Sequence, residues 1–244
     1  TYTGKPPVIL PGIRAGEPHQ AASLQTVPTG SVLVIRASGA SRLDVAVSGG
    51  LTEAAREGTP VPPAGTEEHR YTITDRGTAT LRGVLDEDVV FNFAAIPDRA
   101  PTIALIKEPE PQARGALQLS YKLEDDYGVV GAQANFALKQ KPGKTPRPLY
   151  GAPDFALVLP QARTRNGVGQ TTKDLSDHPW AGAEVVLTLT ARDEAGNEGS
   201  SSPTEFKLPE RVFVKPLARA LIEQRRNLAL DADMKELVLK ALDA

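Results

Sequence analysis

Residues 116–123 read Ala-Leu-Gln-Leu-Ser-Tyr-Lys-Leu, and this stretch decides the fold class. Its apolar side chains, Leu117, Leu119, Tyr121 and Leu123, occupy every second position. In an extended strand, alternate side chains point to the same face, so this segment has one apolar and one polar face. The pattern is typical of a strand in an antiparallel sheet that covers a core on one side only.

Apolar runs of the same kind recur on both sides of this stretch. Before it, we expect strands at residues 31–36, 43–47, 70–74, 78–81 and 89–94. Asp75-Arg76-Gly77 predicts a turn between the third and fourth of these. After it, we expect strands at residues 103–106, 129–138, 155–159, 184–190 and 204–208. Repeated short strands without helices between them favour sandwiches over a parallel α/β sheet.

A short linker divides these strands into two groups. Residues 96–101 contain two prolines, Pro97 and Pro101, with charged residues between them, which makes the segment stiff. The sequence therefore predicts a mainly β chain with two tandem immunoglobulin-like antiparallel β-sandwiches, followed by a helical tail. The expected bounds are residues 1–97, 98–209 and 210–244. We expect Trp180 to fill one end of the second core, and residues 57–68, rich in proline and glycine, to form an exposed loop.

The tail changes from strand to helix periodicity. Pro216 suits the first position of a helix, where its missing N–H costs nothing. A second helix is expected to begin at Asp233, because Glu236 three residues later resembles a capping box. The apolar stripes would comprise Leu217, Leu221, Gln224 and Leu228 in the first helix and Met234, Leu237, Val238 and Leu242 in the second.

Two interpretations of the first tail helix remain open. In the first, its stripe packs on the second sandwich or on a partner helix, while Arg219, Arg225 and Arg226 are solvated. In the second, these arginines contact anionic lipid or nucleic acid. Glu223 and Asp231 dilute the positive charge, which favours the first interpretation and self-association through the helices.

Composition excludes several classes of function. The chain has 28 basic and 30 acidic residues, a net charge of −2, which argues against a general phosphate-binding surface and against a nucleic-acid partner. The absence of cysteine excludes disulfides, thiolate metal sites and a cysteine nucleophile. No stretch reaches the roughly 20 apolar residues of a membrane-spanning helix. The chain begins at Thr1 without methionine, so we expect it to be a fragment of a larger protein.

Acidic residues provide the best candidate site. In an immunoglobulin-like sandwich, the predicted loops at residues 124–126 and 193–197 lie at the same end, and the linker brings Asp98 nearby. Carboxylate and amide oxygens are the ligands that calcium prefers. The candidate ligands are Asp98, Asp125, Asp126, Asp193 and Asn197.

A local interpretation competes with the calcium site. Asp193 and Asn197 suit a tight turn, because their side chains bind nearby backbone N–H groups, and Asp125 and Asp126 would shape a turn in the same way. Arg99 or Arg192 would then neutralise the surrounding charge. The spacing matches no dedicated calcium loop, which favours the turns.

Catalytic patterns are absent from the sequence. His19, His69 and His178 stand alone in or beside expected loops, which makes a zinc site improbable. No Gly-x-Ser-x-Gly elbow occurs, and Gly167-Val168-Gly169 lacks the lysine and the following helix of a phosphate loop. With 5% aromatic residues, a sugar-stacking cleft is poorly supplied. We therefore expect no catalytic residues and no cofactor.

Two sets of segments resemble known proteins. Residues 123–129 and 190–197, the second ending in Ala-Gly-Asn, look like segments of bacterial immunoglobulin-like repeats. Residues 2–7, 125–128 and 216–226 resemble a family of uncharacterised membrane-anchored proteins of alphaproteobacteria. That resemblance implies amino-terminal transmembrane helices, a periplasmic body and a low-complexity carboxy-terminal region, and it carries no catalytic residues.

These observations together predict a non-enzymatic, periplasmic interaction or spacer module of an inner-membrane-anchored protein. Its partner would be another protein or a second copy, contacted through the C-terminal helices. Any contact with the membrane would come from segments outside this chain. The alternatives are a calcium-stiffened adhesive repeat and an accessory domain of a carbohydrate-active enzyme.

Overall fold

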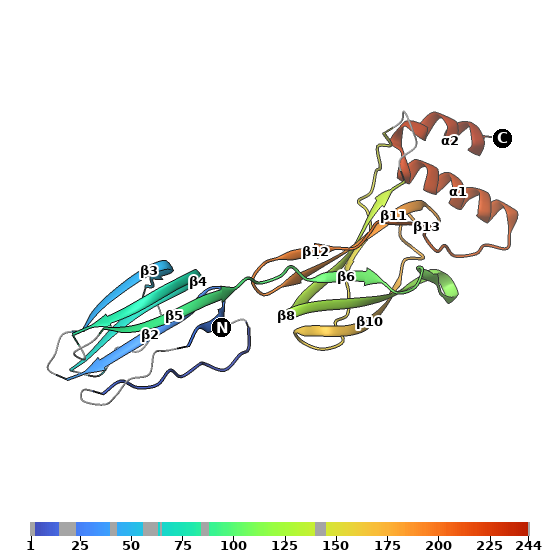
Figure 1. Ribbon diagram of the computed structural model, residues 1–244. Helices are drawn as coiled ribbons and strands as arrows, with labels where there is room; N and C mark the ends of the chain where they lie inside the picture. The colour runs from blue at the N-terminus through green and yellow to red at the C-terminus, as the bar shows by residue number, and fades with distance from the viewer. Residues whose placement is uncertain are drawn as a thin grey trace. The chain divides into compact units, whose positions relative to one another are not determined.

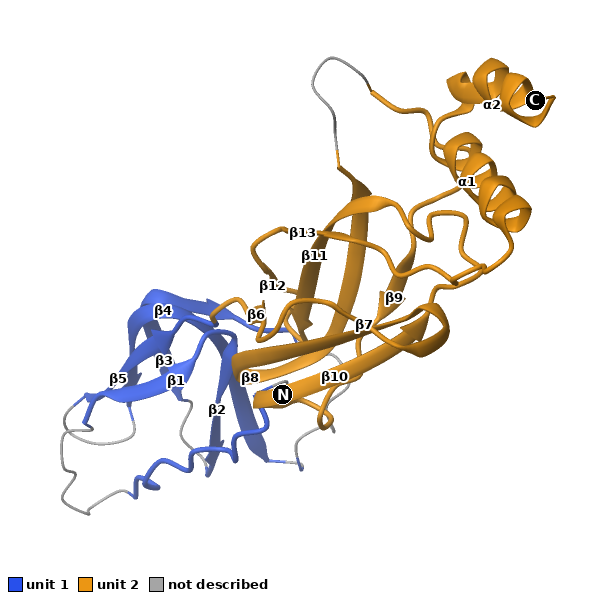
Figure 2. Cartoon of the chain, turned by 90° about the vertical axis from the view of Figure 1, so that its right-hand side faces the viewer, with its two compact units in different colours: residues 1, 3–98 blue, residues 2, 99–244 orange. Residues whose placement is uncertain are grey.

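The computed structural model describes residues 3–14, 23–39, 43–55, 63, 65–83, 88–139 and 145–243. Contacts divide the chain into two compact units, residues 1 and 3–98 and residues 2 and 99–244 (Figure 2). The predicted fold class is confirmed: the chain is mainly β, and two helices follow the last strand (Figure 1).

The described residues of the first unit form a five-stranded sheet. Its strands are β1 (Gln25–Pro28), β2 (Ser31–Ser38), β3 (Asp44–Glu53), β4 (Thr66–Arg82) and β5 (Val89–Ile96). They are arranged in the order β1-β5-β4-β2, and β3 also pairs with β4. The β1–β5 pair is parallel, in contrast to the wholly antiparallel arrangement expected, whereas the other pairs are antiparallel.

The second unit contains an eight-stranded sheet and the helices. Its strands are β6 (Thr102–Leu105), β7 (Glu110–Pro111), β8 (Ala116–Leu138), β9 (Asp154–Ala156), β10 (Thr164–Asp174), β11 (Glu184–Asp193), β12 (Glu198–Ser200) and β13 (Thr204–Lys207). The helices are the short η1 (Ala113–Gly115), α1 (Pro216–Leu230), the short η2 (Ala232–Met234) and α2 (Lys235–Leu242).

One long strand, β8, builds both layers of the second unit. Its first half pairs with β6 and β10, and its second half pairs with β9 and β11. Leu119 from the first half and Phe136 from the second belong to one buried cluster, together with Leu187 of β11. The two halves of β8 therefore face each other across a shared core.

The first unit uses β4 in the same way. The N-terminal half of β4 pairs with β2 and its C-terminal half pairs with β5, while β3 pairs with both halves. Ile73 before the bend and Leu81 after it lie in one buried cluster. Each unit therefore depends on a strand that continues from one layer into the other.

Two turns expected from the sequence are bends inside these strands. The predicted turn at residues 75–77 and the predicted loop at residues 124–126 are wrong as chain reversals, because β4 and β8 run through them. Opposite the first bend, the register of β3 shifts between Gly49 and Leu51, so the partner strand accommodates the change of direction. Polar, turn-forming residues thus mark a bend without ending the strand.

Side chains fill the second core as the alternation predicts. Leu117, Leu119 and Leu123 are fully buried, and burial of each leucine contributes about 2 kcal/mol. Tyr121 is also buried, and its hydroxyl lies 2.6 Å from the Val158 carbonyl oxygen, to which it donates. Trp180 closes one end of this core, as expected, and its Nε1–H donates to the Tyr150 carbonyl at 3.1 Å.

Strand β10 has no counterpart in the sequence interpretation. Its sequence, TRNGVGQTTKD, shows no alternation of large apolar residues. Two of its inward positions are filled by threonines, Thr164 and Thr171, both buried. The Thr171 hydroxyl is 2.6 Å from the Tyr121 hydroxyl and accepts a hydrogen bond from the Val158 N–H at 2.8 Å. The strand forms because β8 pairs with it and because these hydroxyls are satisfied.

The helical tail begins where the sequence predicts, but its second helix starts differently. Helix α1 begins at Pro216, as expected. Asp231 caps the short η2, because its carboxylate accepts the Asp233 N–H at 3.1 Å, and α2 begins only at Lys235. The predicted capping role of Asp233 is therefore wrong.

Of the predicted exposed loop, residues 57–62 and 64 lie outside the described residues, and β4 already begins at Thr66.

A glycine pair tests the close packing of β12 against the segment before β6. A Cβ atom on Gly199 would overlap the Pro101 carbonyl oxygen, whereas a Cβ on Gly131 would meet no atom within 4 Å. We expect Gly199→Ala to lower the unfolding free energy of the second unit by about 1–3 kcal/mol. Gly131→Ala is the matched control and should change it little. Equal effects in urea unfolding would contradict this packing.

Candidate functional site

The acidic candidates of the second unit form hydrogen-bonded turns. The Asp125 carboxylate accepts the Tyr127 N–H at 3.0 Å and also the Gly128 N–H. Asp193 is 3% exposed, and its two carboxylate oxygens accept the backbone N–H and the side-chain Nδ2–H of Asn197, each at 2.8 Å. These are the bonds that the local interpretation predicts.

Some of the predicted calcium ligands are nevertheless neighbours. Burial raises the pKa of Asp125, and the negative charges of Asp126 and Asp193 raise it further, against the lowering effect of the two backbone hydrogen bonds. Asp98 belongs to the first unit, whereas the other four candidates belong to the second. Within the described ranges, no three histidine, cysteine or acidic side chains are grouped as metal ligands. The calcium site therefore stays a prediction.

Cations other than the expected ones neutralise this region. Arg163 forms an ion pair with Glu194, and Lys122 forms one with Glu124. We expected Arg99 or Arg192 to neutralise the acidic residues, but among the described residues the ion pairs are made by Arg163 and Lys122. Arg163 precedes the unrecognised strand β10, so its position near Glu194 could not be inferred from the sequence.

A second site lies where α1 docks on its sandwich. Main-chain hydrogen bonds attach the end of α1 to the connection before β9: the Leu149 N–H donates to the Ala229 carbonyl at 2.9 Å, and the Ala232 N–H donates to the Arg147 carbonyl at 2.9 Å. Ala229 is buried, and Leu230 packs on the second core. The C-terminal end of α1 is therefore part of the second unit.

An ion-pair network holds the middle of α1. The Arg226 Nη1–H donates to Glu210 at 2.5 Å, and Lys207 contacts the other oxygen of Glu210 at 2.7 Å. Burial alone would raise the pKa of Glu210, but the hydrogen bonds and charges of Lys207 and Arg226 bring it below its ordinary value. The pair lies directly over Gly182, whose positive φ of 78° and missing Cβ allow the approach.

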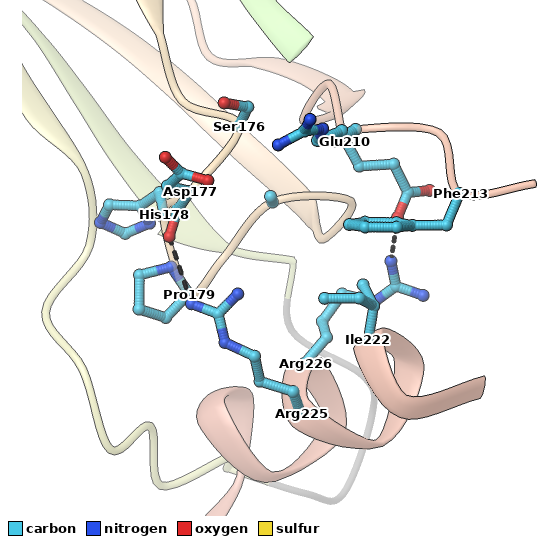
Figure 3. Close-up of a pocket in the computed structure, with 11 residues that line it drawn as sticks. Ser176, Asp177, His178, Pro179, Glu210, Phe213, Ile222, Arg225 and Arg226 are labelled. Atoms are coloured by element: carbon cyan, nitrogen blue, oxygen red, sulfur yellow. Dashed lines mark hydrogen bonds and ion pairs between the residues drawn. The ribbon is translucent and has the colours of Figure 1, made fainter. Parts of the chain in front are cut away.

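A small pocket lies beside this network, between residues 174–183 and α1 (Figure 3). Its volume is about 70 Å³. We call it the arginine pocket, and its lining comprises Ser176, Asp177, His178, Pro179, Ala181, Glu210, Arg211, Phe213, Ile222, Arg225 and Arg226. Arg225 enters from α1, and its Nη2–H donates to the Asp177 carbonyl at 3.2 Å. The guanidinium of Arg211 lies 6.0 Å from the centre of the Phe213 ring.

His178 is held as a neutral imidazole at the edge of this pocket. Its Nδ1 accepts the Trp180 N–H at 3.1 Å, and the two rings meet edge to face. Burial lowers the pKa of His178, and the positive charge of Arg225 lowers it further. The imidazole thus lies against the tryptophan that closes the core and within reach of the charge of Arg225 on the docked helix.

The docking face of α1 corrects the sequence interpretation. Leu217 and Leu221 of the predicted stripe are 73% and 48% exposed, whereas Gln224 and Leu228 are half-buried, so the first half of the stripe does not pack on the sandwich. Arg226, expected to be solvated, has a side chain that is only 20% exposed. Glu210 and the Asp177 carbonyl supply partners for the arginines, and these partners lie 16 and 48 residues away in sequence. Helix periodicity alone could not reveal them.

The whole chain, residues 1–244, matches the model of a family described as a domain of unknown function, DUF4175. The chain belongs to the DUF4175 family. This confirms the expected membership of an uncharacterised family. A comparison with curated proteins gives no match.

Several solved structures are similar to this DUF4175 chain. They include the adhesin InvE of Yersinia pseudotuberculosis (12% identity, 75% of this chain and 56% of that chain, TM-score 0.26). Domains FN1–FN3 of chicken CNTN1 are 13% identical, over 80% of this chain and 64% of that chain, with a TM-score of 0.29. Titin domains I67–I69 are 9% identical, over 79% of this chain and 63% of that chain, with a TM-score of 0.25. The chain covers less than two thirds of each, and the TM-scores are too low to inform its function.

A calcium titration tests the acidic site of the DUF4175 chain. The calcium hypothesis predicts that the melting temperature rises when calcium is added to the metal-free protein, and that Asp125→Asn combined with Asp126→Asn removes the rise. Magnesium serves as the control cation, because it demands shorter, octahedral coordination. A flat calorimetric titration with calcium would exclude calcium binding, and the turn interpretation would then be the one that holds.

The environment of His178 predicts acid sensitivity of the second unit. Its pKa is lowered in the folded state from the ordinary 6.5, so the unfolded chain binds the proton first as the pH falls. Stability present above pH 6.5 is therefore lost as the pH falls through the folded-state pKa. His178→Gln should melt with less pH dependence than the wild type, and His69→Gln in the first unit is the control. A pKa above 6.5 for His178 in an NMR titration would refute this.

Proposed function

We propose that this chain is a non-enzymatic interaction and spacer module of a membrane-anchored periplasmic protein. The observation that carries the proposal is the set of exposed leucines on α1 and α2, held on a unit whose own core is already filled. Large exposed apolar side chains that are grouped on one element are typical of interaction sites.

The environments of the titratable groups support a role without catalysis. Where the described residues have shifted pKa values, structure explains the shift. Burial accounts for Tyr71 and Tyr121, and ion pairs account for Glu68 and Lys139. The pKa of Asp174 is lowered by hydrogen bonds from Ser176 within a turn. Catalysis would use shifted groups that converge in a cleft.

The docked arrangement of α1 supports an interaction through the helices. Ala229 and the arginines occupy the face against the sandwich, which leaves Leu217 and Leu221 outward. Helix α2 adds Leu237, Leu239 and Leu242, which are 50–60% exposed. We propose that these leucines contact another protein or a second copy of this chain. No cofactor is needed for that role.

The localisation rests on the family resemblance of residues 2–7, 125–128 and 216–226. In the described part of the chain, neither helix has the length and apolar character to cross a bilayer. We therefore propose that an anchor, where present, lies outside this chain, and that the two β units serve as spacers in the periplasm.

Sedimentation velocity tests the role of the exposed leucines. We expect the wild type to self-associate at micromolar concentration and Leu217→Ser combined with Leu221→Ser to weaken that association at least about tenfold, because two apolar contacts are lost. Val168→Ser is the control, because Val168 is also exposed but lies on β10. If the double variant and the wild type sediment identically as monomers, self-association is excluded, and a protein partner becomes the remaining form of the proposal.

A further inference from the structure

Three arginines converge on the arginine pocket from two separate segments. Arg225 and Arg226 come from α1, and Arg211 comes from the segment between β13 and α1. Figure 3 shows Arg225 and Arg226 on one side of the pocket and Ser176 and Asp177 on the other. Such convergence brings like charges together, which is unfavourable unless an opposite charge lies among them.

The carboxylates that line the pocket do not balance these cations. Arg226 and Lys207 share the single charge of Glu210, which leaves one positive charge. Arg225 donates to a main-chain carbonyl, and among the described residues neither Arg225 nor Arg211 has a carboxylate within ion-pair distance. The lining therefore holds three arginines against the two carboxylates of Asp177 and Glu210, an excess of one positive charge, and Lys207 adds a second just outside the lining.

The neighbouring imidazole adds no negative charge to the pocket. Burial lowers the pKa of His178, and the charge of Arg225 lowers it further, so the imidazole is neutral beside the arginines. Arginine presents several N–H donors in a planar fork that matches the oxygens of carboxylate and phosphate.

The size of the pocket limits what it can hold. A volume of about 70 Å³ accommodates about five water-sized groups, at roughly 10–15 Å³ for each. A tetrahedral oxyanion or a carboxylate group fits this space, whereas a nucleotide or a sugar ring does not.

We propose that the arginine pocket is a binding site for a single oxyanion group, held between Arg211 and Arg225. The source of the oxyanion is either free phosphate or a carboxylate carried by a partner. The site does not depend on the proposed interaction through the exposed leucines, because its lining includes none of them.

Calorimetric titration of the full chain with inorganic phosphate, and separately with acetate, tests the site at constant ionic strength. We expect saturable binding of at least one anion by the wild type. Arg211→Gln combined with Arg225→Gln should weaken it at least about tenfold, through loss of two charge-assisted hydrogen bonds. Arg192→Gln, an exposed arginine of β11 in the same unit, is the matched control and should bind as the wild type does.

Each result decides the proposal. Binding of phosphate alone assigns the site to a tetrahedral anion, and binding of acetate assigns it to a carboxylate. No saturable binding of either anion, or equal binding by the double variant, overturns the site. Chemical-shift mapping of the wild type gives a second measurement that does not depend on the variants folding: amide shifts should be confined to residues 176–181, 211 and 225–226, and shifts elsewhere alone would refute it.

Discussion

The continuity of one bent strand in each unit is the constraint on which the rest of the structure depends. Strand β8 supplies Leu119 to one layer and Phe136 to the other, and both side chains lie in a single core. Because side chains alternate strictly along a strand, the bend at residues 124–128 must keep the apolar face inward on both sides. Asp125 makes that possible by accepting backbone N–H groups that would otherwise lose their partners at the bend.

The docking of α1 follows a different physical rule from the packing of the sandwiches. Its contact with the second unit combines main-chain hydrogen bonds at Ala229 and Ala232 with a partly buried ion pair between Arg226 and Glu210. Breaking a partly buried ion pair leaves an uncompensated charge, so we expect this pair to favour the docked arrangement over alternatives that separate the two groups. The helix is therefore held in one orientation, and its leucines remain available on the outside.

The sequence predicted an element correctly where its residues suit only one kind of local structure. Alternating apolar residues identified the core strands, and Pro216 identified the start of α1. It failed at residues 75–77 and 124–126, because turn-forming residues are equally suited to a bend within a strand. It also missed β10, where buried threonines replace the expected apolar side chains. Of the calcium candidates, Asp125 and Asp193 accept backbone hydrogen bonds within local turns, and calcium binding stays a prediction.

The sequence by itself determined that this chain is mainly β, that it ends in helices, and which faces of its main strands are buried, because side-chain periodicity is a local property of the backbone. Only the tertiary structure decided which face of α1 meets the sandwich and that Arg211, Arg225 and Arg226 line one pocket with His178. The physical reason is that charge pairing depends on distance in space. The Asp177 carbonyl meets Arg225 across β11, β12 and β13, and Glu210 meets Arg226 across the connection that leads into α1.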